Sequence, residues 1–167
     1  PHEPSTKLWP IPLGAESSED VPALLETREL RLPIADDERF NIRDSAHFIT
    51  HYSPAHLARL LAKVWSFDEL GRLQLLHEQS LLARGGITPS ADLVALLQAY
   101  ADETSQNVWD IMAVTLGELK KFVESDEAAE AKLRAFSRQL ATPLFARLGW
   151  EAQDSEPESD TKLRGLI

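Results

Sequence analysis

The chain has 167 residues, of which 43% are hydrophobic and 26% are charged, a composition typical of soluble globular proteins. The formal net charge is −10, from 27 acidic and 17 basic residues. This balance argues against a nucleic-acid partner, because phosphate binding requires a basic surface. The chain has no cysteine, which excludes disulfides and thiolate metal sites and fits the reducing cytoplasm, where we expect the protein to be located. No apolar run approaches the roughly 20 residues that span a bilayer, so we expect no membrane partner.

The first third of the chain contains four short segments that favour extended backbone: residues 8–13, 30–34, 39–43 and 47–52. Apolar residues alternate with polar residues or proline in the last three segments, as in half-buried strands. Pro10, Pro12 and Pro33 cannot donate a ladder hydrogen bond, so the first two segments are expected to be edge or irregular strands. Four strands this short make a poor independent sheet, and we expect them to pack on another part of the protein.

After residue 53 the apolar residues recur at helical spacing. Ser53-Pro54 is expected to open the first helix, as an N-cap followed by proline at the first helical position. Ser66-Phe67-Asp68-Glu69 is interpreted as a capping box for a second helix that ends at Gly85-Gly86. Thr88-Pro89 is expected to cap a third helix. The helical part of the chain is therefore expected to begin with three helices that are joined by short connections.

Two longer helices are predicted next, from about residue 105 to 124 and from about residue 126 to 148. Gly149 is a suitable C-cap for the second of them. Short connections between helices of this length favour antiparallel neighbours, so we expect helical hairpins like those of a solenoid.

The end of the sequence changes character twice. Residues 151–160 are acidic and rich in turn-forming residues, and we predict a linker there. Leu163, Leu166 and Ile167 then begin another apolar pattern, from which we expect the natural protein to continue. The predicted fold class is mainly α with a small antiparallel β part.

Two histidine patterns are candidate metal sites. His77-Glu78-Gln79-Ser80-Leu81 resembles the H-E-x-x-H motif of zinc proteases, in which two histidines share a helical face. Leucine stands at the second histidine position, so a surface or capping role is the better interpretation. His47 and His51 lie on one face of a predicted strand, with His56 on the following helix, and three imidazoles bind zinc where they converge. The alternative is a polar sheet face beside the start of a helix.

Other catalytic signatures are weak or missing. The sequence contains no Gly-rich phosphate loop and no G-x-S-x-G motif. Acidic pairs such as Asp36-Asp37 and Asp102-Glu103 are more often solvated, and Glu103 can instead pair with a base across the helical array. The four tryptophans lie near predicted element ends and are interpreted as packing anchors: Trp9, Trp65, Trp109 and Trp150. We therefore predict no catalytic residue and no metal ligand in this chain.

Five blocks of sequence match the motifs of one family in the correct order: residues 9–13 (W-P-I-P-L), Asn41 with residues 46–52, residues 71–78 with 82–86, Glu103-Thr104 with Trp109, and Leu148-Gly149-Trp150 with Leu163-Arg164. Together they resemble the C-terminal part of the zinc aminopeptidase N family. Ile49 stands where many members have arginine, Ala46 where they have glycine, and Glu78 where they have aspartate. These departures suggest a divergent bacterial branch, similar to the members from lactic-acid bacteria.

The resemblance implies a domain organisation and a function. Residues 1–53 are expected to be part of a β-sandwich domain, and residues 54–167 the first part of an α-superhelix of the HEAT/armadillo type, with the acidic linker at 151–160. The catalytic domain and its zinc ion are expected upstream in the same polypeptide, with no cofactor in this chain. The parent protein would remove N-terminal residues from peptide substrates. This non-catalytic part would shape and gate the cavity through which the peptide enters.

Six positions that match the family motifs are expected to be structural anchors, through hydrogen bonds and packing between successive helices or onto the sheet: Asn41, Tyr52, Arg72, Glu78, Glu103 and Trp109. Two other functions stay open. One is a free-standing helical-repeat scaffold that binds another protein along a concave surface. The other is a zinc enzyme that uses His47, His51 and His56.

Overall fold

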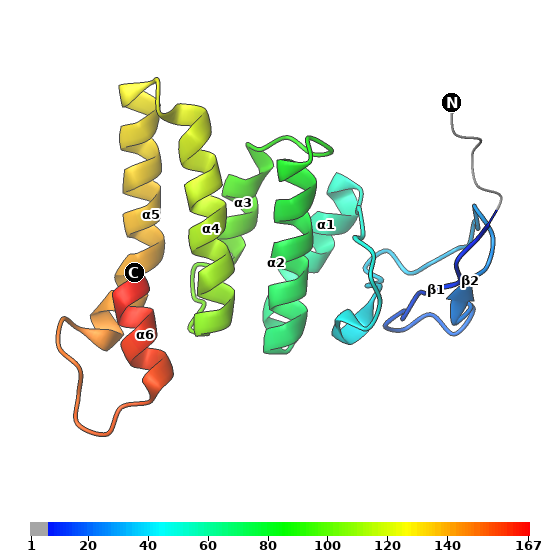
Figure 1. The fold of residues 1–167 in the computed structure, drawn as a ribbon, viewed down its shortest axis with the longest axis horizontal. Helices are drawn as coiled ribbons and strands as arrows, with labels where there is room; N and C mark the ends of the chain where they lie inside the picture. Colours follow the sequence, from blue (N-terminus) through cyan, green and yellow to red (C-terminus); the bar gives the residue numbers. More distant parts are fainter. Residues whose placement is uncertain (1–6) are drawn as a thin grey trace. The chain divides into compact units, whose positions relative to one another are not determined.

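The computed structural model describes residues 7–167, so the first six residues of the predicted N-terminal domain lie outside the described part. The chain divides into two compact units (Figure 1). The first ends at Leu60, and the second comprises Leu61–Ile167. The prediction of a mainly α chain with a small antiparallel β part is confirmed.

The N-terminal unit contains one small sheet. Strands β1 (Ile11–Pro12) and β2 (Leu24–Leu25) pair antiparallel, with Ile11 opposite Leu25 and Pro12 opposite Leu24. β1 lies within the first predicted strand segment. The sequence analysis did not predict β2.

The other three predicted strands, at 30–34, 39–43 and 47–52, are not formed. In the second of them, Asn41 and Arg43 have φ values of 56° and 66°, which are incompatible with a strand. A 3₁₀ turn, η1 (Ile42–Asp44), occupies that segment instead. Alternation of apolar residues indicates an extended chain, but a strand also needs a neighbouring strand with which to exchange hydrogen bonds.

All five predicted helices are present, and a sixth follows them. In chain order the described helical elements are α1 (Pro54–Ala62), the 3₁₀ turn η2 (Val64–Ser66), α2 (Glu69–Arg84), α3 (Asp92–Ala99), α4 (Gln106–Val123), α5 (Glu127–Leu148) and α6 (Glu158–Leu166). α6 begins inside the region predicted as a linker, so only residues 151–157 connect α5 to it. None of the described helices is both long enough and apolar enough to cross a membrane.

The helix caps explain where these helices begin. Ser53 accepts a hydrogen bond from a backbone N–H in the first turn of α1, as expected, and Ser105 and Asp126, predicted only as approximate helix starts, do the same for α4 and α5. The capping box at residues 66–69 is corrected: Asp68, not Ser66, is the N-cap of α2 and accepts from the Gly71 N–H. Thr88 does not cap α3, which begins only at Asp92.

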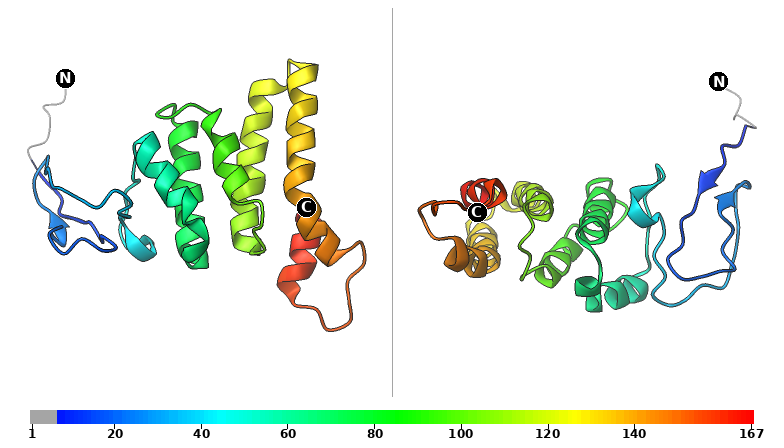
Figure 2. Two further views of the ribbon diagram at one scale, coloured as in Figure 1. Left: turned by 180° about the vertical axis from the view of Figure 1, so that it is seen from behind. Right: turned by 90° about the horizontal axis from the view of Figure 1, so that it is seen from below.

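Within the C-terminal unit the helices form two layers (Figure 2). α2, α4 and α6 lie side by side in one layer, with α4 packed on both neighbours, and α3 and α5 lie in the other. Because successive helices reverse direction, α2 and α4 run parallel (Figure 1). The core between the layers is apolar, and its most deeply buried members include Leu76, Leu97, Tyr100, Val108, Met112, Leu140 and Leu163.

Candidate functional site

The described residues contain no group of three or more histidine, cysteine, aspartate or glutamate side chains placed to hold a metal ion. His47, His51 and His56 therefore do not form such a group. The Nε2 of His56 lies 2.8 Å from the carbonyl oxygen of Glu38. Because that oxygen can only accept, Nε2 donates the hydrogen bond and is not free to ligate a metal. The zinc site considered for these three histidines does not fit the structure.

A buried ion pair joins two of the predicted anchors. Arg72 of α2 donates to both carboxylate oxygens of Glu103, with Nε–Oε2 at 2.7 Å and Nη2–Oε1 at 3.1 Å. The Glu103 side chain is fully buried, and that of Arg72 is 15% exposed. Pairing of Glu103 with a base across the helical array was one alternative that the sequence left open, and the structure identifies that base as Arg72. This bidentate geometry is the strongest form of an arginine–carboxylate contact.

Backbone groups complete the surroundings of Glu103. Its Oε1 accepts hydrogen bonds from the backbone N–H groups of Thr104 and Ser105, each at 2.9 Å. Burial alone would raise the pKa of Glu103, but the hydrogen bonds from Arg72, Ser105 and Thr104 and the charge of Arg72 lower it overall. The carboxylate therefore stays ionised and holds the chain just before α4.

The same cluster includes a third predicted anchor and a residue that the sequence analysis did not select. Trp109 of α4 donates from its indole N–H to the carbonyl oxygen of Glu103 at 2.8 Å. Tyr100, which is fully buried, donates its hydroxyl to the carbonyl oxygen of Arg72 at 2.8 Å. These contacts tie α2 to the connection between α3 and α4. We call Arg72, Tyr100, Glu103 and Trp109 the α2–α4 hydrogen-bond network.

Glu78, the remaining predicted anchor on a helix, does not take part in the α2–α4 hydrogen-bond network. It lies on α2 with 6% of its surface exposed and accepts from the Nε2 of Gln74, one helical turn earlier, at 3.1 Å. This hydrogen bond along the helix holds the buried carboxylate in place.

Asn41 and Tyr52 lie in the N-terminal unit. The Asn41 side chain is buried and donates to the Ala46 carbonyl while accepting from the Ala46 N–H, both at 2.8 Å. This pair of hydrogen bonds stabilises the left-handed backbone of Asn41, which asparagine tolerates better than most residues. The Tyr52 hydroxyl accepts from the Phe40 N–H at 3.3 Å. Both residues thus hold the turn at 39–46.

The N-terminal unit also contains a buried carboxylate that the sequence did not indicate. Glu38 is completely buried and accepts from the backbone N–H groups of Glu16 and Ser17 and from the hydroxyls of Ser17 and Ser18. Burial raises the pKa of Glu38, but these hydrogen bonds outweigh it and lower the pKa overall. No local pattern identifies such a residue, because its partners lie about 20 positions away in the chain.

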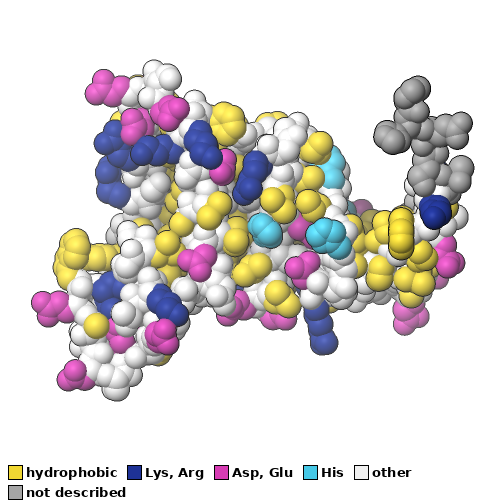
Figure 3. Space-filling view, in the orientation of Figure 1, with side chains coloured by type: hydrophobic (Ala, Val, Ile, Leu, Met, Phe, Trp, Pro, Cys, Tyr) yellow, Lys and Arg dark blue, Asp and Glu magenta, His cyan; other side chains and the backbone are white. Residues whose placement is uncertain are grey.

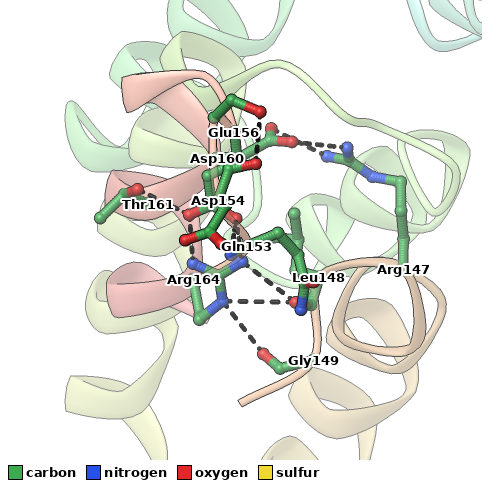
Figure 4. A network of polar contacts seen from close by, with 10 residues as sticks. Arg147, Leu148, Gly149, Gln153, Asp154, Glu156, Asp160, Thr161 and Arg164 are labelled. Carbon is green, nitrogen blue, oxygen red and sulfur yellow. Dashed lines mark hydrogen bonds and ion pairs between the residues drawn. The ribbon is translucent and has the colours of Figure 1, made fainter. Parts of the chain in front are cut away.

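Figure 4 shows a network at the end of the chain that was also not anticipated. Arg164 of α6 pairs with Glu156, with both nitrogen–oxygen distances at 2.6 Å. The same guanidinium donates to the carbonyl oxygens of Leu148 at 3.0 Å and Gly149 at 3.2 Å, at the C-terminus of α5. Beside it, Arg147 pairs with Asp160 at 2.9 Å. The family block that joins Leu148-Gly149 to Leu163-Arg164 was the signal that could have identified Arg164.

Among the surface cavities of the C-terminal unit, two have aromatic side chains in their lining. One, of about 730 Å³, lies between α5 and α6 beside Phe145 and Trp150. The other, of about 280 Å³, lies between α2 and α4 and is lined by His77, Arg84 and Phe122 among others. Both are surface cavities, and the residues of the α2–α4 hydrogen-bond network line neither of them.

Taken together, the polar groups of these networks bind one another. Each buried carboxylate that we describe already has its hydrogen-bond partners, and the hydroxyl of Ser80, which lines the same cavity as His77, donates to the Leu76 carbonyl oxygen at 2.7 Å. Such an arrangement positions helices and turns relative to their neighbours in the chain. Its chemistry is that of a structural support.

Comparison with known proteins gives a consistent family. The ERAP1-like C-terminal domain family matches residues 39–167. Aminopeptidase N from Lactobacillus helveticus is 31% identical over 170 residues, covering 97% of this chain and 20% of the relative. Aminopeptidase N from Lactococcus lactis subsp. lactis (strain IL1403) is 29% identical over 170 residues, covering 96% and 20%. Aminopeptidase 2 from Candida albicans is 29% identical over 169 residues, covering 96% and 18%. The chain spans about one fifth of the length of these relatives.

Proposed function

This chain belongs to the ERAP1-like C-terminal domain family, and on that premise we propose that it is the non-catalytic C-terminal part of a zinc-dependent aminopeptidase. The observation that carries the proposal is the similarity to proteins named aminopeptidases, which extends over almost the whole chain but over only about one fifth of each relative. The parent protein removes N-terminal residues from peptides. The zinc ion belongs to an upstream catalytic domain, which is the main partner of this chain.

The proposal includes the division of labour within the chain. Residues 1–53 are part of the β-sandwich domain, and residues 54–167 begin the helical superhelix. The six anchors, from Asn41 to Trp109, keep turns and helices in place and take no part in the reaction. Their hydrogen-bonded surroundings support this role, because a group that is already paired inside the fold is not available to a substrate.

The helical part shapes and gates the cavity through which peptides reach the catalytic zinc. Its two-layered arrangement of hairpins supports this proposal, because one layer presents parallel helices along one side (Figure 2) and a surface cavity lies between two of them, α2 and α4. We place the parent protein in the cytoplasm, in keeping with a chain that has no cysteine.

The test compares the chain alone with the chain joined to the segment that precedes it in the parent protein. Each is purified, its metal content is measured, and hydrolysis of a panel of aminoacyl-anilides is followed with and without added zinc. We expect turnover and bound zinc only in the longer protein. Zinc-dependent turnover by the 167-residue chain alone would overturn the proposal.

The gating role needs a separate measurement. The parent protein and a version that lacks residues 54–167 are compared for kcat/KM on an aminoacyl-anilide and on a peptide of about ten residues. Removal of a gate is expected to change the ratio of the two values. An unchanged ratio would leave a catalytic parent protein whose helical part has no influence on substrate size.

A further inference from the structure

The cavity between α5 and α6 lies beside the most exposed large apolar side chain of the described part of the chain. Trp150 is 85% exposed, and its ring meets the Phe145 ring edge to face with the ring centres 4.8 Å apart. Both rings line the cavity, whose volume of about 730 Å³ leaves room for a further aromatic ring. On the side of the molecule seen in Figure 3, apolar side chains protrude at the edge beside α5. One surface therefore carries both a protruding ring and a cavity.

The same surface carries a positive and a negative charge that are not used within the chain. The charged side chains that line the cavity are Arg138 and Arg164, and no carboxylate of the described residues is in the lining. Arg164 is paired within the α5–α6 hairpin, whereas the exposed Arg138 side chain has no hydrogen bond or ion pair with another described residue. Glu151, which is also exposed and without such a partner, stands between two lining residues, Trp150 and Ala152.

We call Arg138, Phe145, Trp150 and Glu151, with the cavity beside them, the α5–α6 patch. Its features complement one another about a twofold axis. In a twofold contact both copies use the same surface, so a residue that meets another across the axis does so twice. The ring of one copy then faces the cavity of the other, and the arginine of one faces the glutamate of the other. A second copy of the chain thus supplies both the apolar and the acidic group that the patch calls for.

The contact area corresponds to a weak dimer. An aromatic side chain buries about 150–250 Å², so two Trp150 rings and the cavity walls that they cover account for roughly 600–1,000 Å² in total. Transient contacts lie below about 1,200 Å², and stable dimers bury more. A dissociation constant on the order of 0.1 mM is therefore expected.

We propose that the α5–α6 patch joins two copies of this chain in a twofold-symmetric dimer. Trp150 of each copy inserts into the cavity of the other, beside Phe145, and Arg138 of each copy pairs with Glu151 of the other. The dimer does not depend on the proposed catalytic role of the parent protein, because the contact involves neither a substrate nor a metal ion.

The experiment measures the molecular mass of the 167-residue chain by sedimentation equilibrium, at concentrations from about 10 μM to about 1 mM, which bracket the expected dissociation constant. The average mass is expected to rise with concentration from that of one chain, 18.7 kDa, toward twice that value. Circular dichroism of every variant reports whether the helical fold is kept.

Two variants test the apolar part of the contact. Trp150→Ala removes the protruding ring and is expected to weaken the dimer at least about 30-fold, as for a tryptophan at the centre of an interface. Gly165→Gln fills the cavity instead, because Gly165 lines it and a Cβ there would meet no other atom within 4 Å. Glutamine is a better helix former than glycine, so this variant keeps α6 and is also expected to weaken the dimer.

Two charge reversals test the polar part. Arg138→Glu and Glu151→Arg each place like charges opposite one another, and each is expected to weaken the dimer about fivefold. The double variant restores the pairs with their signs exchanged, and its dissociation constant is expected to return to that of the unchanged chain. The matched control is Lys132→Glu, which reverses an exposed charge on α5 outside the patch and is expected to have little effect.

Three results with the 167-residue chain would overturn the proposal: a monomer up to about 1 mM, a dimer that Trp150→Ala leaves unchanged, or single charge reversals that the double variant does not rescue. The parent protein gives a fourth. If it stays monomeric at the same concentrations, another part of the same polypeptide covers the patch, and the proposal is wrong. None of these results bears on catalysis, so the proposed function and the dimer fail independently.

Discussion

At the scale of single residues, the contact between Arg72 and Glu103 shows how a buried charge is tolerated. The Glu103 carboxylate is fully buried, yet its oxygens accept from the Arg72 guanidinium and from two backbone N–H groups. Burial of an ion pair costs desolvation free energy, so such a pair stabilises the fold little beyond what an apolar pair would contribute. The loss of one partner is different, because it leaves the other charge buried without compensation.

We therefore expect Glu103→Ala to lower the free energy of unfolding by about 3 kcal/mol. Urea unfolding, followed by circular dichroism, measures the change. Glu103→Gln keeps the shape and one acceptor and is expected to cost less. The comparison variant is Glu130→Ala on α5, whose partner Arg134 is 62% exposed, and it is expected to cost no more than about 0.5 kcal/mol. Equal effects of Glu103→Ala and Glu130→Ala would contradict a buried role for the pair.

At the scale of elements, the α5–α6 hairpin depends on one arginine. Arg164 satisfies carbonyl groups at the C-terminus of α5, where a helix leaves its last acceptors without internal partners. Its charge is balanced by Glu156 in the connecting loop, and the two side chains are 11% and 10% exposed. Leu163, the preceding residue, is buried in the core. The arginine and the leucine thus fix α6 from two sides.

The hairpin is expected to loosen in acid. The hydrogen bonds from Arg164, Thr161 and the Gln153 N–H lower the pKa of Glu156 from 4.5 to about 2. A carboxylate whose pKa is lowered by folding stabilises the fold above the unfolded pKa and loses that effect as the pH falls. Amide exchange in α6, corrected for its intrinsic pH dependence, is therefore expected to increase as the pH falls from about 4.5 to about 2.

Two substitutions test the source of this pH dependence. Glu156→Gln is expected to speed amide exchange in α6 already at neutral pH and to remove most of its change in acid. Glu158→Gln is the control, because its pair with Lys162 is more than half exposed on both sides. If α6 responds to acid equally in both variants, Glu156 does not hold the hairpin.

At the scale of the whole molecule, the two compact units differ in what stabilises them. The second unit, Leu61–Ile167, contains nearly all of the buried apolar residues. The described part of the first unit has a sheet of only two two-residue strands, and Leu8, Trp9, Leu24, Leu30 and Ile34 are all exposed there. Such a small sheet is marginal on its own in water.

We predict that a fragment of residues 53–167 folds without the preceding segment. Ser53 is kept because it caps α1. The fragment is expected to retain the helical circular dichroism signal of the full chain and a single cooperative urea transition at a similar midpoint, whereas residues 1–52 alone are expected to remain unfolded. A non-cooperative transition of the longer fragment would show that its core depends on the N-terminal unit.

Helix positions and the family were accessible from the sequence, because each rests on local or ordered information, but the caps expected at Ser66 and Thr88 were wrong. A helix is closed by hydrogen bonds four residues apart, so periodic leucines and a residue such as Ser105 or Asp126 suffice to place it. Glu103 could be suspected of pairing because an acid in a helical array rarely remains without a base. The ordered motifs indicated an aminopeptidase family without any knowledge of the fold.

Only the tertiary structure decided the features that depend on distant partners. Three predicted strands did not form, since pairing requires a neighbouring strand, and the left-handed backbone at Asn41 is held by side-chain contacts with Ala46. Arg72 meets Glu103 across 31 positions in the sequence, and Glu38 binds a loop about 20 positions earlier. The cavity between α2 and α4 likewise exists only because two helices pack side by side. Local periodicity determines which helices form, whereas the packing of those helices decides which side chains meet.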